Sequence, residues 1–245
     1  RSLWTLILSL IIKSQIMNVK LISVIIVICF SLNIFAQNTI LFMGGIAHLG
    51  NGEKIENSVI SVKNGKFELV ADANKIRIDP SAFDTIIKIY GKHIYPGFIS
   101  PNTTLGMTEI DAVRATRDFD EVGMFNPNVR SLIAFNTDSK ILKTVRTNGV
   151  LITQATPRGG IISGTSSVMF LDGWNWADAQ LRADDGIHLN WPSTYYTYGW
   201  WAQPGSTSKN KDYQKGVKDI KQYFEIAKSY HQNNTEIDIE LEATK

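Results

Sequence analysis

The chain has 245 residues, 44% hydrophobic and 20% charged, an ordinary globular composition that permits one large domain or two small ones. Its formal net charge of +2 comes from the first 36 residues, which hold Arg1, Lys13 and Lys20 and no acidic residue. The remainder has 22 basic residues against 23 acidic ones, and this balance, without a basic run, excludes a nucleic-acid-binding protein.

Residues 17–36 have the layout of a secretory signal peptide. Lys20 is followed by an apolar run over residues 21–35 and then by the small residue Ala36. We expect cleavage after Ala36, a mature chain that begins at Gln37, and export to the periplasm or the medium.

Residues 1–16 do not begin with Met and are interpreted as translated sequence upstream of the true start. The alternative is a membrane hairpin, but the apolar run at residues 3–12 is shorter than the roughly 20 residues that a spanning helix needs. Cys29 is the only cysteine, so the mature chain has no disulfide or thiolate site. Lipidation of Cys29 is disfavoured because the large residue Ile28 stands where a lipoprotein has a small residue. Membrane contact is expected only through the signal segment.

Four short segments rich in Ile, Val and Phe predict a small β layer in residues 37–95, at 39–43, 58–62, 67–70 and 85–90. Between them, Gly44-Gly45, Asn51-Gly52 and Asn64-Gly65 predict turns. Residues 93–100 (HIYPGFIS) predict a buried strand entered through a Pro-Gly turn, where a second region, 96–245, begins.

In the second region, Asp138 or Ser139 is expected to cap a helix that ends at Gly149. The apolar segment Val150–Ala155 predicts the next strand, and a helix followed by a strand indicates α/β layering. The remaining predictions are a strand at 167–171, a polar surface loop at 203–211, a helix at 212–231 and a strand that begins at 237–241.

Several short motifs stand in the order and spacing of one enzyme superfamily. They lie at residues 57–60, 64–66, 91–92, 96–99 (PGFI), 148–150, 157–160 and 164–166. On these motifs, residues 39–192 resemble the N-terminal part of amidohydrolase-superfamily enzymes, most of all the imidazolonepropionase-like branch. The resemblance implies an α/β fold in which a small β-sandwich precedes a TIM-like (β/α)8 barrel. Because such a barrel takes about 250 residues, residues 96–245 would form only its first part.

In that family an Asp-x-His-x-His sequence follows the Pro-Gly-Phe-Ile strand, and its two imidazoles hold a divalent metal such as zinc. Here Asn102 and Thr104 occupy the two expected histidine positions. Alternate residues of a strand face the same side, but zinc sites use Cys, His and carboxylates. The resemblance thus implies a metal cofactor that these residues do not support, and no catalytic residue is assigned.

Other candidate sites have weaker patterns. The histidines His48, His93, His188 and His231 show no pair at metal-ligand spacing, so structural roles are expected for them. Residues 157–167 (PRGGIISGTSS) lack the lysine of a P-loop and predict a tight βα loop that lines the barrel mouth.

Two further features leave alternatives open. Residues 109–121 alternate in charge and fit a solvated loop, although Arg114 and Arg117 could hold a substrate carboxylate. The aromatic residues Trp174, Trp176, Trp191, Tyr195, Tyr196, Tyr198, Trp200 and Trp201 are expected to pack a long loop against the barrel, with ligand stacking as the alternative.

The resemblance implies hydrolysis of carbon–nitrogen bonds other than peptide bonds in a small-molecule substrate. The lost histidine pair keeps a second function open, a non-catalytic paralogue that binds a ligand or pairs with an active amidohydrolase in a homo- or hetero-oligomer. A carbohydrate-binding surface on the aromatic cluster is a third hypothesis.

Overall fold

The computed structural model describes residues 39–200, 202–232 and 237–244, which fall into two compact units divided between Pro96 and Gly97. The predicted signal peptide with Cys29 and the preceding residues 1–16 lie outside the described residues, so those predictions stay predictions. Along the described chain, no helix has both the length and the apolar character needed to cross a membrane.

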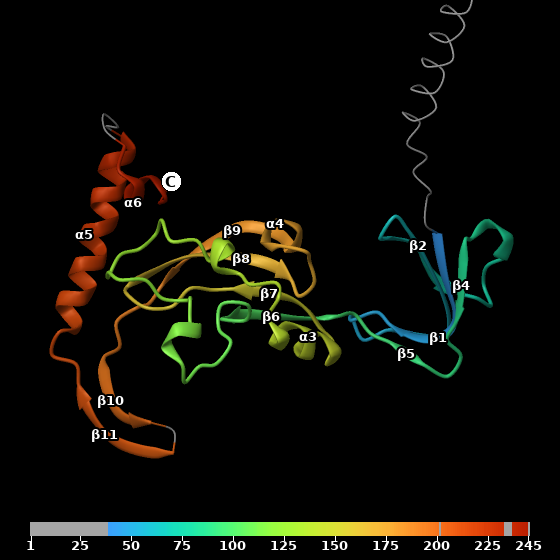
Figure 1. The fold of residues 1–245 in the computed structure, drawn as a ribbon, viewed down its shortest axis with the longest axis horizontal. Coiled ribbons are helices and arrows are strands. Elements are labelled where there is room, and N and C mark those ends of the chain that lie inside the picture. The colour runs from blue at the N-terminus through green and yellow to red at the C-terminus, as the bar shows by residue number, and fades with distance from the viewer. Residues whose placement is uncertain (1–38, 201, 233–236, 245) are drawn as a thin grey trace, which may run out of the picture. The chain divides into compact units, whose positions relative to one another are not determined.

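The first unit contains one five-stranded sheet (Figure 1). Its strands are β1 (Thr39–His48), β2 (Lys54–Lys63), β3 (Lys66–Asp72), β4 (Thr85–Lys88) and β5 (His93–Ile94), with the 3-10 helix η1 (Pro80–Ala82) before β4. The order is β3-β2-β1-β4, and β5 also pairs with β1. β1 is antiparallel to β2 and parallel to both β4 and β5.

Two of the glycine-containing pairs that predict turns have different outcomes in the structure. Asn64 and Gly65 have φ of 51° and 74°, as a two-residue hairpin turn requires, so this prediction is confirmed. The turn predicted at Gly44-Gly45 is wrong, because both residues lie inside β1, where the register with β2 shifts. Gly44 has φ 84°, and a Cβ there would come within 2.2 Å of the Tyr90 ring, so the glycine serves a bulge and a close contact.

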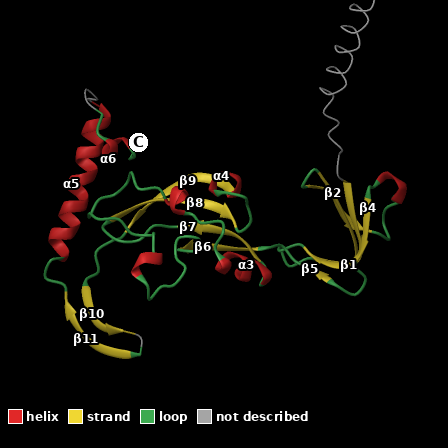
Figure 2. Cartoon of the chain, viewed as in Figure 1, coloured by secondary structure: helices red, strands yellow, loops and turns green. Residues whose placement is uncertain are grey.

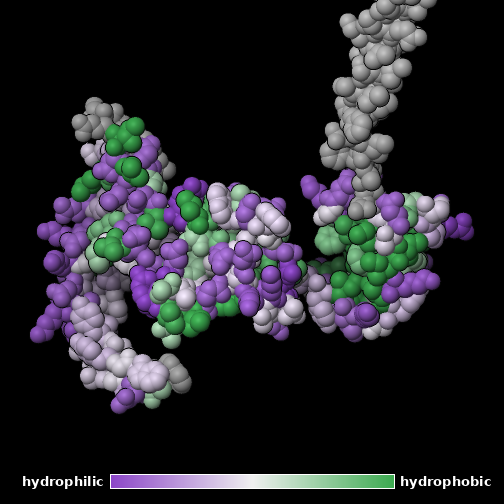
Figure 3. All heavy atoms as spheres, viewed as in Figure 1, coloured by the Kyte–Doolittle hydropathy of each residue, from purple (hydrophilic) through white to green (hydrophobic). Residues whose placement is uncertain are grey.

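The sandwich implied by the resemblance is not formed by residues 39–96, which build a single sheet. One face of that sheet is apolar, and Figure 3 shows hydrophobic side chains gathered on this unit. A hollow of about 430 Å³ lies there. Its apolar lining comes from Phe42, Ile60, Val62, Phe67, Ile89 and Ile94. Phe67 is 76% exposed at this hollow, whereas Ile60 is buried.

The second unit is built around a four-stranded sheet of order β6-β7-β8-β9. The strands are β6 (Phe98–Thr103), β7 (Val150–Ala155), β8 (Ile162–Phe170) and β9 (Gln180–Leu189), and a separate hairpin pairs β10 (Tyr195–Trp200) with β11 (Gln203–Lys209). The helical segments are η2 (Arg114–Thr116), α2 (Ser131–Ala134), α3 (Lys140–Thr147), α4 (Trp176–Ala179), α5 (Tyr213–Gln232) and α6 (Ile239–Glu242). Figure 2 shows the resulting mixture of strands and mostly short helices.

The β6–α3–β7 segment agrees with the predicted α/β layering. β6 and β7 are parallel and α3 lies between them in the chain, as a parallel crossover requires. Ser139 is the cap of α3, and its hydroxyl accepts a hydrogen bond from the Ile141 backbone at 3.2 Å. Beyond β7 the pattern changes, because β8 and β9 are antiparallel to their neighbours. The sheet of the described residues is therefore open and does not close into a barrel.

Three further strand and loop predictions need correction. The strand expected at 93–100 is split into β5 and β6, since the Pro-Gly step interrupts it. The loop expected at 203–211 forms β11, paired with the aromatic strand β10. The strand expected at 237–241 is the helix α6, because the Asp238 side chain caps it by accepting hydrogen bonds from two backbone N–H groups. The helix predicted at 212–231 is confirmed as α5.

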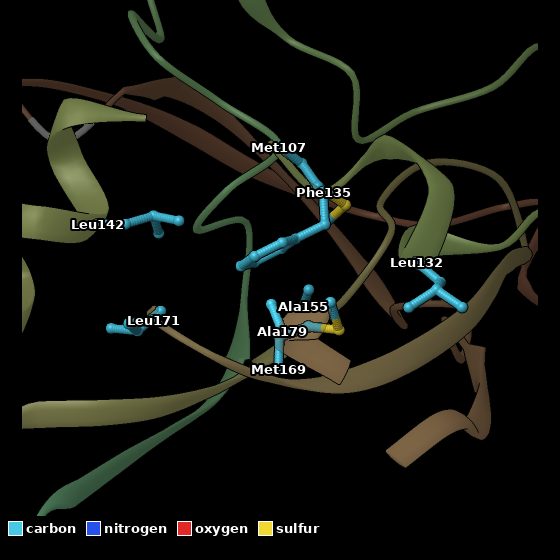
Figure 4. Close-up of a cluster of buried hydrophobic side chains, with 8 residues drawn as sticks. All are labelled: Met107, Leu132, Phe135, Leu142, Ala155, Met169, Leu171 and Ala179. Atoms are coloured by element: carbon cyan, nitrogen blue, oxygen red, sulfur yellow. The ribbon is translucent and has the colours of Figure 1, made fainter. Parts of the chain in front are cut away.

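The core of the second unit includes residues of β7 and β8 and the helices beside them (Figure 4). Its buried apolar residues are Met107, Leu132, Phe135, Leu142, Ala155, Met169, Leu171 and Ala179. Full burial of a large apolar side chain stabilises a fold by about 1.5–3 kcal/mol, so this cluster fixes α2 and α3 against the sheet. It thereby also fixes the carboxyl ends of β6 and β7.

Candidate functional site

The carboxyl ends of β6 and β7 meet at one edge of the sheet, because the two strands are parallel. This is the edge at which barrel enzymes carry their active sites. Asn102 is the penultimate residue of β6, and Thr104 directly follows the strand. Thr104 is half-buried, and its carbonyl accepts the Met107 backbone N–H at 2.9 Å.

Asn102 has a left-handed backbone, with φ of 50°. Asparagine adopts this conformation more readily than most residues. The turn presents both the backbone and the side-chain oxygen of Asn102 to Arg158. The Arg158 guanidinium donates to Oδ1 at 2.6 Å and to the carbonyl oxygen at 2.7 Å. These two short charge-assisted hydrogen bonds from one guanidinium hold the end of β6 in place.

A polar network continues from Asn102 across β7 to β9. The Gln154 side-chain oxygen accepts the Asn102 backbone N–H at 3.2 Å, and its Nε2 donates to Asp185 at 2.9 Å. Asp185 also pairs with Arg182, at 3.2 Å from Nε. Gln154 thus links a residue at the end of β6 to a carboxylate on β9.

The charges of Arg158 and Asp185 also act on His188, which lies on β9. Burial lowers its pKa, the positive charge of Arg158 lowers it further, and Asp185 acts in the opposite direction. The neutral imidazole is therefore favoured in the folded protein. Sequence reasoning gave His188 only a structural role, and nothing in the local sequence places it near Arg158.

The residues at this edge do not fit the metal that the resemblance implies. Asn102 and Thr104 offer neutral oxygens, which are not zinc's usual ligands. Arg158 adds a permanent positive charge that is hydrogen-bonded to one of the two positions. At an effective dielectric of about 20, a guanidinium and a divalent ion about 5 Å apart repel by several kcal/mol. Among the described residues, no three His, Cys, Asp or Glu side chains stand together as a metal site.

A hollow of about 230 Å³ lies between the segment after β6 and α2. Met107, Phe119 and Ile133 give it apolar walls, and Asp118 and Glu121 give it charge. Arg130 also lines it. In a second contact, the Arg130 guanidinium binds Asp184 on β9 through two hydrogen bonds of 2.9 and 2.6 Å, so its charge is already paired.

The two arginines considered for a substrate carboxylate are partly engaged. Arg114 lies 3.6 Å from Asp120 and donates to the Arg117 carbonyl oxygen at 3.0 Å. The Arg117 guanidinium lies over the Phe119 ring, 5.8 Å from its centroid. Neither arginine lines the hollow.

The glycine-rich segment 157–167 is not the βα loop that was predicted. It connects β7 to the antiparallel strand β8 and supplies the first residues of β8. Gly159 and Gly160 both have positive φ, which lets the chain reverse within this short connection. The same turn carries Arg158, the residue that contacts Asn102.

The aromatic cluster does not pack as predicted. The described members are exposed, from 41% for Trp176 to 89% for Trp174. Tyr195, Tyr196 and Tyr198 lie on the hairpin strand β10. Trp201 lies outside the described residues.

The first unit contains a histidine pair that sequence reasoning missed. His48 ends β1 and His93 begins β5, and parallel pairing of these strands brings Nε2 of His48 to 2.9 Å from Nδ1 of His93. The Tyr95 ring stacks on His48 at 4.2 Å between centroids. Because 45 residues separate the two histidines, no local spacing could have indicated the pair. His231 lies exposed in the last turn of α5.

Comparison with known proteins gives a likeness of fold. No family model matches the sequence, and no curated protein does. An amidohydrolase from Thermotoga maritima MSB8 is similar in structure, with a TM-score of 0.65 and 19% identity over 83% of this chain and 54% of that chain. Ochratoxinase from A. niger aligns over 32% of this chain and 18% of its own, at 15% identity and a TM-score of 0.26, which carries no weight. The chain thus has a partial amidohydrolase-like fold and spans about half the length of the Thermotoga protein.

Proposed function

We propose that this chain is part of an exported amidohydrolase-like protein of the imidazolonepropionase-like branch, which hydrolyses carbon–nitrogen bonds other than peptide bonds in small molecules. The likeness to the Thermotoga amidohydrolase over 83% of the chain supports the proposal. The motifs from residues 57 to 166 agree with it. In this reading β6 and β7 are the first two strands of a (β/α)8 barrel, joined through α3.

The contact between Arg158 and Asn102 carries the mechanistic part of the proposal. A guanidinium has five N–H donors, and two of them bind Asn102. The remaining donors and the fixed charge suit a carbonyl or carboxylate oxygen of a ligand. Arg158 would thus orient a substrate oxygen at the edge where the family's first-strand metal would lie.

A second candidate function is favoured by the same contact. A protein with neutral side chains at the two expected imidazole positions, and a guanidinium bound to one of them, is suited to bind a ligand without metal-assisted hydrolysis. It would then be a non-catalytic paralogue that acts alone or as the partner subunit of an active amidohydrolase.

Restoring the histidines separates the two functions. We compare Asn102→His/Thr104→His with the same pair combined with Arg158→Met, and use Arg182→Met in place of Arg158→Met as the matched control. After dialysis against a weak chelator, zinc is counted by mass spectrometry and hydrolysis of N-acyl amino acids and cyclic amides is assayed. We expect zinc retention only when Arg158 is removed, because its charge competes with the ion.

The unmodified protein should hold far less than one zinc ion at this edge. If it instead retains about one zinc that Asn102→Ala/Thr104→Ala does not release, the metal site is built elsewhere. Hydrolysis by that protein would then favour the enzyme, and the non-catalytic paralogue would lose its main support.

Export has its own test. The order of Lys20, the apolar run and Ala36 predicts that the exported protein begins at Gln37. N-terminal sequencing of the protein recovered outside the cytoplasm checks this, and a chain that keeps residues 17–36 would contradict it.

A further inference from the structure

One face of the small sheet brings together three side chains with metal-binding chemistry. His48 and His93 lie 2.9 Å apart, Nε2 to Nδ1, and Tyr95 stacks on His48 with its ring tilted by 13°. The third side chain is Glu56 on β2. Lys54 pairs with His48 in the β1–β2 register, and alternation places Glu56 on the same face as Lys54.

The electrostatics of Glu56 agree with the placement that the strand register gives. The pKa of Glu56 is lowered first by its hydrogen bond and charge interaction with Lys54, and both His93 and His48 add to the lowering. Nothing in the proposed hydrolytic site uses these residues, because all of them belong to the first unit.

We propose that His48, His93 and Glu56 bind one divalent transition-metal ion, with Cu²⁺ preferred to Zn²⁺. The two ring nitrogens now share a hydrogen bond of 2.9 Å, so they are close enough to ligate one ion once the rings turn. The ligand set carries the preference, because a site of nitrogen and oxygen ligands binds Cu²⁺ more tightly than the other first-row divalent ions, and imidazole also suits Ni²⁺.

Binding requires small rearrangements at an accessible place. His93 is exposed, so its ring can turn until both lone pairs face the ion. Glu56 must leave Lys54, to which it is bound at 2.6 Å, but both side chains are more than half exposed and such surface pairs add little stability. Three such groups do not yet stand in ligating positions among the described residues, so Glu56 moves when the ion binds.

The alternative is that the two histidine rings only hydrogen-bond and stack as part of the sheet. Only the proposed site predicts that the chain binds a metal ion through these rings. The experiment uses the full chain without a polyhistidine tag, titrated with CuCl₂ or NiCl₂ by calorimetry and followed for copper by electron paramagnetic resonance. The variants are His48→Gln/His93→Gln and Glu56→Gln, and the control is His188→Gln/His231→Gln.

We expect about one ion per chain with nitrogen couplings from two imidazoles in the copper spectrum. The His48→Gln/His93→Gln variant should lose this binding and these couplings. Glu56→Gln should weaken it about tenfold, since it removes a charged ligand. The control should bind like the unmodified chain. Equal binding by the unmodified chain and the His48→Gln/His93→Gln variant, or a copper spectrum without two imidazole nitrogens, overturns the proposal. Because the readout is binding alone, neither result depends on whether the protein hydrolyses a substrate.

Discussion

Two polar clusters of this chain arise in the same way but are suited to ligands of opposite charge. Parallel pairing of β6 with β7 places Asn102 near the turn that carries Arg158, and parallel pairing of β1 with β5 places His48 beside His93. The first cluster has a permanent cation bound to Asn102, one of the two positions where the family resemblance implies imidazoles. The second has imidazoles at a place where no motif predicts a site.

The difference shows that strand pairing decides which residues meet, while side-chain chemistry decides what they can hold. A guanidinium stays charged at all physiological pH values and repels metal ions. Neutral imidazoles bind metal ions and are the commonest protein ligands for them. The edge of the larger sheet is therefore suited to anionic or carbonyl oxygens, and the face of the smaller one to a cation.

The largest expected effect follows from removing the fixed cation. Arg158→Met deletes both bonds to Asn102 and should destabilise the second unit by about 1.5–3 kcal/mol, the worth of hydrogen bonds to a charged group. Arg182→Met is the control, because its ion pair is exposed and worth less than about 1 kcal/mol. The urea midpoints of both variants give the measurement. Equal shifts would mean that the Arg158 contact is no stronger than an ordinary surface pair.

A smaller effect is expected at the backbone of Asn102. Asn102→Ala puts a Cβ without a local hydrogen-bonding group at φ 50° and should cost about 1–2 kcal/mol. Asn102→Gly also removes the side-chain bond to Arg158 but relieves the backbone, so it should unfold at a higher urea concentration than Asn102→Ala. If Asn102→Ala instead unfolds at the higher urea concentration, the left-handed backbone of residue 102 does not limit the stability of these variants.

The smallest effect concerns pH and tests the reach of the Arg158 charge. The pKa of His188 is lowered in the folded protein, by burial first and Arg158 second. The unfolded chain, with a histidine pKa of about 6.5, then binds the proton more readily. Stability from this residue is therefore present above that pH and is lost as the pH falls below it. His188→Gln should flatten the acid limb of thermal stability between about pH 7 and pH 5, and Arg158→Met should flatten it partly.

The sequence predicted the elements whose signals are local. The strand Val150–Ala155 and the Ser139 cap are confirmed because an apolar run and a capping hydroxyl act within a few residues. The predicted strand at 237–241 is wrong because the Asp238 cap outweighs the β-branched pattern there. The turn at Gly44 was misread because a bulge and a turn require the same positive φ.

The candidate sites depend on contacts between distant residues, and these could not be predicted. Asn102 was singled out from its place in a motif, but its partner Arg158 lies 56 residues away. His48 and His93 are 45 residues apart. Each contact depends on which parallel strands pair, and a single sequence does not encode that pairing in any local spacing.

The pairing of β1 has a consequence for the order in which the chain is made. One edge of β1 is covered by the adjacent strand β2, but the other edge pairs with β4 and β5, through contacts such as Thr39 to Asp84 that span 45 residues. At roughly 5–20 residues per second, a ribosome needs on the order of several seconds to supply those strands. During that interval an apolar strand presents open N–H and C=O groups, the template on which neighbouring chains aggregate. The strand made first in this unit is thus completed last, and a nascent chain halted before residue 94 cannot close its own sheet.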